Sequence, residues 1–124
     1  METAEKRHYA VVDAYNRKLT ITYRNQVIAE TTNALLVKEV GASVYNQVFY
    51  LPKGSLKVEL ANETDRTSHC PIKGEASYWN FKENPTEQYF AWSYEEPLPR
   101  SKKIGGYIAF NPAYVTIISA PLEA

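Results

Sequence analysis

The chain has 124 residues, 44% hydrophobic and 13% aromatic, and its fourteen lysines and arginines are balanced by fourteen aspartates and glutamates. Zero net charge argues against a nucleic-acid partner, which needs a basic face, and no run of about eighteen apolar residues exists to span a membrane. A chain of this size can build one core, so we expect a single domain over residues 1–124. Residues 1–17 either belong to that core or form a loosely packed N-terminal extension.

Cys70 is the only cysteine, so neither an intrachain disulfide nor a four-cysteine zinc site can form. The two histidines, His8 and His69, stand at no recognisable metal-ligand spacing relative to Cys70. The first residues are polar and lack the apolar stretch of a secretory signal. We therefore expect a cytoplasmic protein with no metal and no cofactor.

The first predicted element is a β-hairpin. Every second residue of 19–23 is apolar, which is the pattern of a half-buried strand. Residues 24–26 then turn the chain back into a second strand at 27–30.

The next segment, residues 32–40, is the one place where a helix competes with a strand. Asn33 is a suitable helix cap and Gly41 a suitable stop. Val37 and Val40 are β-branched and favour extended backbone, so we predict a strand.

Short apolar or alternating runs bounded by turn residues predict the remaining strands. These lie at residues 47–51, 56–60, 76–82, 88–94, 106–110 and 114–119. The chain is therefore predicted to be mainly β, with about eight short strands and at most one short helix.

Chemistry-bearing side chains gather in residues 67–74, which read Thr-Ser-His-Cys-Pro-Ile-Lys-Gly. Because Pro71 favours extended backbone at Cys70, His69 and Cys70 should point to opposite sides of the chain. A β-turn from Cys70 to Lys73 would bring the thiol and the ammonium group together.

Two interpretations of this stretch remain open. In the structural one, Cys70 is a small buried hydrophobe, Lys73 is a solvated turn residue and His69 is a satisfied structural histidine. In the functional one, these side chains line a cleft that is faced by aromatic residues, with Tyr94 at its rim. The candidate binding residues are Ser68, His69, Cys70, Lys73, Trp79, Trp92 and Tyr94.

The same stretch resembles a known family, domain-of-unknown-function family 427, which sometimes carries a nucleotidyltransferase-like label. The matching residues are 35–39, 48–52, 68–74, 76–79, 91–94 and 106–110. The resemblance implies a mainly-β fold similar to the β-tent group and no established activity. Ile72 departs from the aromatic residue expected at its position, so we do not predict that it stacks on a ligand. The nucleotidyltransferase label finds no support in a glycine loop that could cradle phosphate, because the only neighbouring glycines are Gly105 and Gly106.

Three functions remain open at this stage. The first is a small-molecule-binding domain in which Lys73 favours an anionic ligand. The second is a cysteine-dependent enzyme: Cys70 is the nucleophile, Lys73 favours its thiolate, and His69 or Tyr94 moves protons. The third is a protein-interaction module that uses exposed aromatic residues and the turn at residues 95–99. The ligand, the reaction and the oligomeric state stay open.

Overall fold

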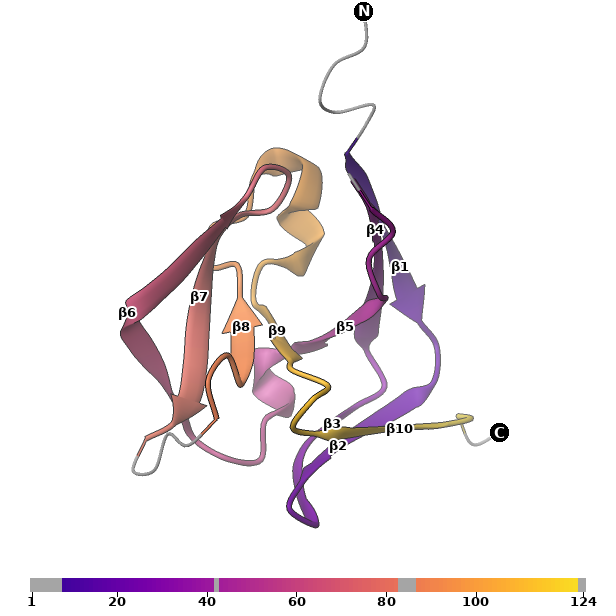
Figure 1. Ribbon diagram of the computed structural model, residues 1–124. Helices are drawn as coiled ribbons and strands as arrows, with labels where there is room; N and C mark the ends of the chain where they lie inside the picture. The colour runs from indigo at the N-terminus through magenta and orange to yellow at the C-terminus, as the bar shows by residue number, and fades with distance from the viewer. Residues whose placement is uncertain (1–7, 42, 83–86, 123–124) are drawn as a thin grey trace, which may run out of the picture.

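The computed structural model describes residues 8–41, 43–82 and 87–122, which form ten strands and two short 3₁₀ helices (Figure 1). The strands are β1 (Tyr9–Tyr15), β2 (Lys18–Tyr23), β3 (Gln26–Thr31), β4 (Ala34–Val40), β5 (Val48–Pro52), β6 (Leu60–Cys70), β7 (Gly74–Phe81), β8 (Ala91–Ser93), β9 (Tyr107–Phe110) and β10 (Thr116–Ala120). The 3₁₀ helices are η1 (Lys53–Ser55) and η2 (Pro99–Ile104). The prediction of a mainly-β single domain is confirmed, and the ambiguous segment at residues 32–40 contains strand β4.

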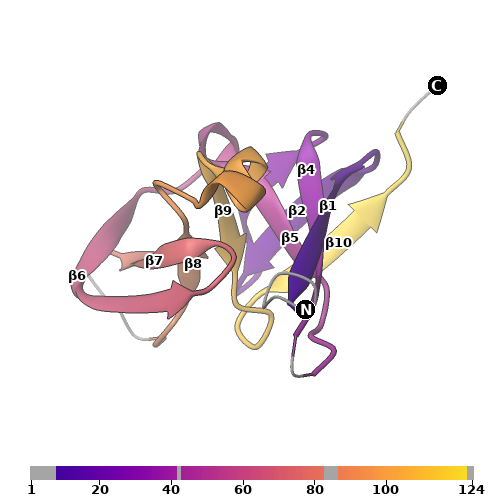
Figure 2. The same ribbon diagram turned by 90° about the horizontal axis from the view of Figure 1, so that it is seen from above.

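The strands form two antiparallel sheets. Seven of them follow the order β1-β4-β5-β9-β8-β7-β6, and the other three follow the order β10-β2-β3. The large sheet is bent, so that β1 and β4 on one side face β6 and β7 on the other, with η2 above the gap between them (Figures 1 and 2). This arrangement agrees with the leaning sheets that the family resemblance implies.

The two faces of the large sheet bury different cores, because neighbouring residues in a strand point to opposite sides. In β5, Leu51 packs into the core shared with the three-stranded sheet, whereas Tyr50 packs into the core on the other face. The same division holds in β9, where Ile108 belongs to the first core and Ala109 to the second. The second core lies beneath the candidate site.

The structure differs from the sequence-based strands at several places. Of the strand predicted at residues 88–94 only β8 forms, because residues 88–89 are a turn, and β1 was not predicted. Residues 56–58 alternate in burial as predicted, but only Leu56 makes an isolated bridge, to Ala29, so this run is not a strand. The longest strand, β6, was not predicted because its sequence is polar and most of its residues are exposed. β6 is a strand because it pairs with β7, both at its start and at its end.

The N-terminal segment contributes a strand of the large sheet. β1 pairs with β4 from Tyr9 opposite Val40 to Tyr15 opposite Ala34. Of the extension suggested for residues 1–17, residues 1–7 lie outside the described part of the chain. Because β1 is paired from its first residue, residue 8 directly before it is held at the end of that strand.

Among the described residues, no helix has both the length and the apolar character needed to cross a membrane.

Candidate functional site

The candidate site begins at the tip of the β6–β7 hairpin. Gly74 has a φ of +106°, a conformation that side-chain-bearing residues rarely adopt, and it allows the chain to reverse directly after residues 71–73. Two contacts from the η2 region fix this tip: the Leu98 N–H donates to the Lys73 carbonyl at 2.9 Å, and the Ser101 hydroxyl donates to the Ile72 carbonyl at 2.8 Å. Because Ile72 is buried, it anchors the tip and does not face a ligand.

A cavity of about 430 Å³ lies beside this tip, between the β6–β7 hairpin and strands β4 and β5. Its walls are largely aromatic. The aromatic lining residues are Tyr45, Tyr50, Tyr78, Tyr89, Trp92 and Tyr94. A cavity of this size and lining is typical of small-molecule sites.

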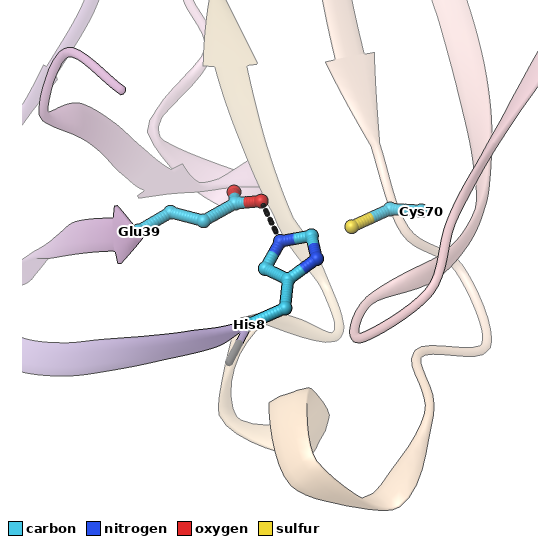
Figure 3. A group of neighbouring side chains, drawn as sticks. All are labelled: His8, Glu39 and Cys70. Atoms are coloured by element: carbon cyan, nitrogen blue, oxygen red, sulfur yellow. Dashed lines mark hydrogen bonds and ion pairs between the residues drawn. The ribbon is translucent and has the colours of Figure 1, made fainter. Parts of the chain in front are cut away.

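Four polar side chains gather in the cavity. Lys73, only 8% exposed, donates through Nζ to Oε1 of Glu39, and its Nζ lies 3.8 Å from Sγ of Cys70. The other carboxylate oxygen of Glu39 lies 2.7 Å from Nε2 of His8. His8, Glu39 and Cys70 point toward one another from the start of β1, from β4 and from the end of β6 (Figure 3). The predicted meeting of the Cys70 thiol and the Lys73 ammonium group is confirmed.

Glu39 is held in its ionised form. Partial burial raises the pKa of Glu39, but the hydrogen bonds from Lys73 and His8 and their nearby positive charge act against burial and leave that pKa below its ordinary value of 4.5. Strand alternation explains its position, because Glu39 shares the inward face of β4 with Leu35 and Val37.

Two tyrosines of the cavity stay protonated. Burial raises the pKa of Tyr94, and the neighbouring acidic groups of Tyr50 and Cys70 raise it further. Burial likewise raises the pKa of Tyr50, whose hydroxyl accepts a hydrogen bond from Trp92 Nε1 at 3.2 Å. Both hydroxyls therefore keep their protons at neutral pH and remain hydrogen-bond donors.

The low pKa of Glu39 predicts a pH dependence of stability. Its folded-state pKa lies below the unfolded value, so its contribution is present above about pH 4.5 and is lost as pH falls through the folded-state pKa. We expect Glu39→Gln to lower the free energy of unfolding by about 1.5–3 kcal/mol at pH 7, because charged hydrogen bonds are lost. The same variant should lose less stability than the wild type between pH 7 and about pH 3.

Urea unfolding at the two pH values measures this effect. Glu59→Gln, at an exposed position after the isolated bridge, is the control and should follow the wild type. Equal acid sensitivity of the wild type and Glu39→Gln would contradict the assignment.

The structure brings most of the predicted site residues to one cavity. Cys70, Lys73, Trp92 and Tyr94 line it, and His69 lies at its edge. His69 points away from Cys70 toward solvent, with its side chain 61% exposed and its Nδ1 2.8 Å from Glu75. Tyr94, expected at the rim, is 7% exposed and belongs to the buried core of the site.

Two predicted residues do not line the cavity. The Ser68 hydroxyl lies 2.9 Å from the hydroxyl of Tyr78, which itself lines the cavity. Trp79 is partly buried on the opposite face of the sheet, where its Nε1 donates to Ser93 at 2.8 Å and Lys53 lies over its ring. The reason is the register, since Tyr78, not Trp79, pairs with Trp92 across β7 and β8.

Sequence reasoning missed His8 and Glu39. Glu39 carried a signal, because it is the one charged residue among the inward-facing positions of an otherwise apolar strand face. His8 carried none, because only the pairing of β1 with β4 brings it to the cavity. Tyr89, which lines the cavity, was also missed; its φ is +57°, and its carbonyl accepts a hydrogen bond from Asn111 at 3.1 Å.

His8, Glu39 and Cys70 also form a set of metal-ligand types. One ligand atom from each lies within 4.8 Å of the other two, and nitrogen, oxygen and sulfur donors together are typical of Zn²⁺ sites. However, the ammonium group of Lys73 already contacts Glu39 and lies beside Cys70. Its positive charge opposes a divalent cation at this point.

The fold and the site define a small, mainly-β domain with an aromatic-walled cavity and a charged hydrogen-bond network inside it. A family model described as a domain of unknown function (DUF427) matches residues 11–120, and the chain belongs to this family. The family predicted from the sequence is thus confirmed. None of the curated proteins compared with the chain matches it.

Proposed function

We propose that the cavity binds a small molecule with an anionic group and a flat apolar body. The observation that supports this most is the buried ammonium group of Lys73 at the base of a cavity of about 430 Å³ with aromatic walls. Flat apolar groups pack well against aromatic rings, and a single charged side chain then selects and orients the ligand.

The balance of charge in the cavity favours an anion over a cation. Glu39 is shared between two basic groups, because one carboxylate oxygen accepts from Lys73 and the other contacts His8. When His8 is protonated, two positive charges face a single negative one. A ligand carboxylate would make the charge of the cavity neutral and accept hydrogen bonds from the remaining N–H groups of Lys73.

Benzoate, benzamide and benzylamine, which differ mainly in charge at nearly constant size, test this function. We expect benzoate to bind with a dissociation constant of about 1 mM and benzamide at least tenfold more weakly, a difference of about 1.4 kcal/mol. Amide chemical shifts in two-dimensional NMR should change around Cys70 and Gly74.

A lysine variant and its control complete the test. Lys73→Met should lose the preference for benzoate over benzamide, whereas Lys57→Met, at an exposed position, should retain it. Equal affinity for benzoate and benzamide in the wild type would contradict an anionic ligand. If none of the three compounds shifts the cavity residues, small-molecule binding at this site is wrong.

A second function, cysteine-dependent catalysis, is favoured by a separate observation. Nζ of Lys73 lies 3.8 Å from Sγ of Cys70, and Cys70 is a free thiol that lines the cavity. Cysteine nucleophiles typically lie beside a positively charged side chain and within reach of a substrate, as Cys70 does. A reactive free thiol also persists best in a reducing compartment, which supports the cytoplasmic location expected from the sequence.

A further inference from the structure

Three residues that are distant in sequence meet in the order carboxylate, imidazole and thiol. The Glu39 carboxylate contacts Nε2 of His8 at 2.7 Å, and one ligand atom each of His8, Glu39 and Cys70 lies within 4.8 Å of the others. In Figure 3, the second ring nitrogen of His8 lies on the side of the Cys70 sulfur. A carboxylate that accepts from Nε2–H leaves the lone pair on Nδ1, where it can accept a proton.

The hydroxyl of Tyr94, in the same cavity, is available to a ligand. Tyr94 is 7% exposed, lines the cavity and lies close to the acidic groups of Tyr50 and Cys70. Its hydroxyl makes no hydrogen bond to any of the residues that the structure describes. Because this hydroxyl faces the cavity and has none of these residues as a partner, it can donate to a bound molecule.

We propose that Cys70 is a nucleophile and His8 its general base in the transfer of an acyl group to water, with Glu39 as the residue that positions His8. This inference rests on the proposed function, since the substrate occupies the same cavity and the product carboxylate is an anion of the class proposed there. Lys73 and Tyr94 supply donors for the negative charge that develops on the acyl oxygen. Lys73 is well placed for this, because its Nζ is 3.8 Å from the attacking sulfur.

The reaction balances with water as the only co-substrate. The thiol proton moves to Nδ1 of His8 while the sulfur of Cys70 forms a bond to the acyl carbon. The bond to the leaving group then breaks, and the leaving group departs with the proton from His8. His8 next takes a proton from water, which attacks the thioester, so that a carboxylic acid is released and the thiol is restored.

The distance between base and nucleophile is compatible with this role. One ring nitrogen of His8 lies within 4.8 Å of Sγ of Cys70, a separation that one water molecule can bridge in a proton transfer. Glu39 holds His8 in place, and the side chain of His8 is only 22% exposed to solvent. His69 has no such arrangement, because its side chain is directed away to Glu75.

The test uses p-nitrophenyl acetate as an activated acyl donor. We expect a burst of p-nitrophenolate and a transient acetyl adduct on Cys70, measured by stopped-flow absorbance and by mass spectrometry of the intact protein and its peptides. Cys70→Ala should abolish both signals. His8→Ala should lower the burst rate constant about 10²-fold, and added imidazole should restore part of it.

Two further variants separate catalysis from structural support. Glu59→Ala is the control and should leave the burst unchanged, because this exposed side chain does not line the cavity. Glu39→Gln should lower the burst rate constant about tenfold, because a carboxylate no longer holds the imidazole of His8; a purely structural role for Glu39 would change only the burst amplitude.

Four outcomes would overturn the inference. They are acylation that persists in Cys70→Ala, a burst that is equal in His8→Ala and wild type, a His8→Ala protein that imidazole does not rescue, and a burst that EDTA abolishes. The last would assign the three side chains to a metal ion.

The binding experiment keeps the two proposals distinguishable. Benzoate binding without any burst would reject acyl transfer and leave the proposed binding function in place. A burst at Cys70 in a protein that does not bind benzoate would reject the anionic ligand and support the nucleophile.

Discussion

Replacing Phe90 with alanine should lower the free energy of unfolding by about 3–5 kcal/mol, the usual cost of removing a large buried aromatic side chain. Phe90 is fully buried, and its ring centroid lies 5.1 Å from those of both Tyr23 and Phe81. Phe110 and Tyr114 also pack against it, at 5.9 and 6.5 Å. The ring therefore joins the three-stranded sheet to the large one, and its loss leaves a cavity between them.

Urea unfolding followed by tryptophan fluorescence measures the effect, with Ile118→Ala as the control. Ile118 is 48% exposed on β10 and should cost about 1 kcal/mol or less. Phe90 belongs to the core on the face opposite the ligand cavity, so the folded Phe90→Ala protein should still bind benzoate with wild-type affinity. A cost for Phe90→Ala as small as that of the control would contradict the packing described here.

The second large effect concerns the ion pair of Lys73 and Glu39 within the cavity. Lys73→Met should cost about 3 kcal/mol, because it leaves the mostly buried carboxylate of Glu39 without its lysine partner. Adding Glu39→Met to that variant should recover much of the loss, since two apolar side chains leave no charge unpaired. We expect the double-mutant cycle to yield a coupling energy of about 1–3 kcal/mol.

The neighbouring strand position provides a matched exposed pair. Lys38 lies 2.9 Å from Asp13, but both side chains are about half exposed, so their coupling energy should be below about 1 kcal/mol. Salt at about 1 M should reduce the coupling of the exposed pair far more than that of Lys73 and Glu39. Equal coupling energies for the two pairs would show that the cavity does not shield its charges from water.

The sequence alone was sufficient for features that depend on near neighbours. Alternation of side chains identified most strands, because a strand with one buried face must place its apolar residues at every second position. The meeting of Cys70 with Lys73 was also predictable, because they are three residues apart across one turn and local backbone geometry decides their separation.

Long-range pairing decided the rest of the site. β6 was not predicted because its polar residues form a strand only through pairing with β7, and Trp79 was assigned to the cavity because the register of β7 against β8 is not readable from either strand. If the register of β7 shifted by one residue, Trp79 would face the cavity in place of its neighbour Tyr78.

His8 and Glu39 show the same limit most clearly. Alternation places Glu39 on an inward face of β4, but the partners of that face depend on how the large sheet bends. His8 reaches Glu39 because β1 pairs with β4, and Cys70 reaches both because the far side of the sheet folds back toward them. Local sequence determined the mainly-β character and one half of the site. The tertiary structure supplied the other half, because contacts between residues 8, 39 and 70 depend on strand order and sheet curvature, which no single segment specifies.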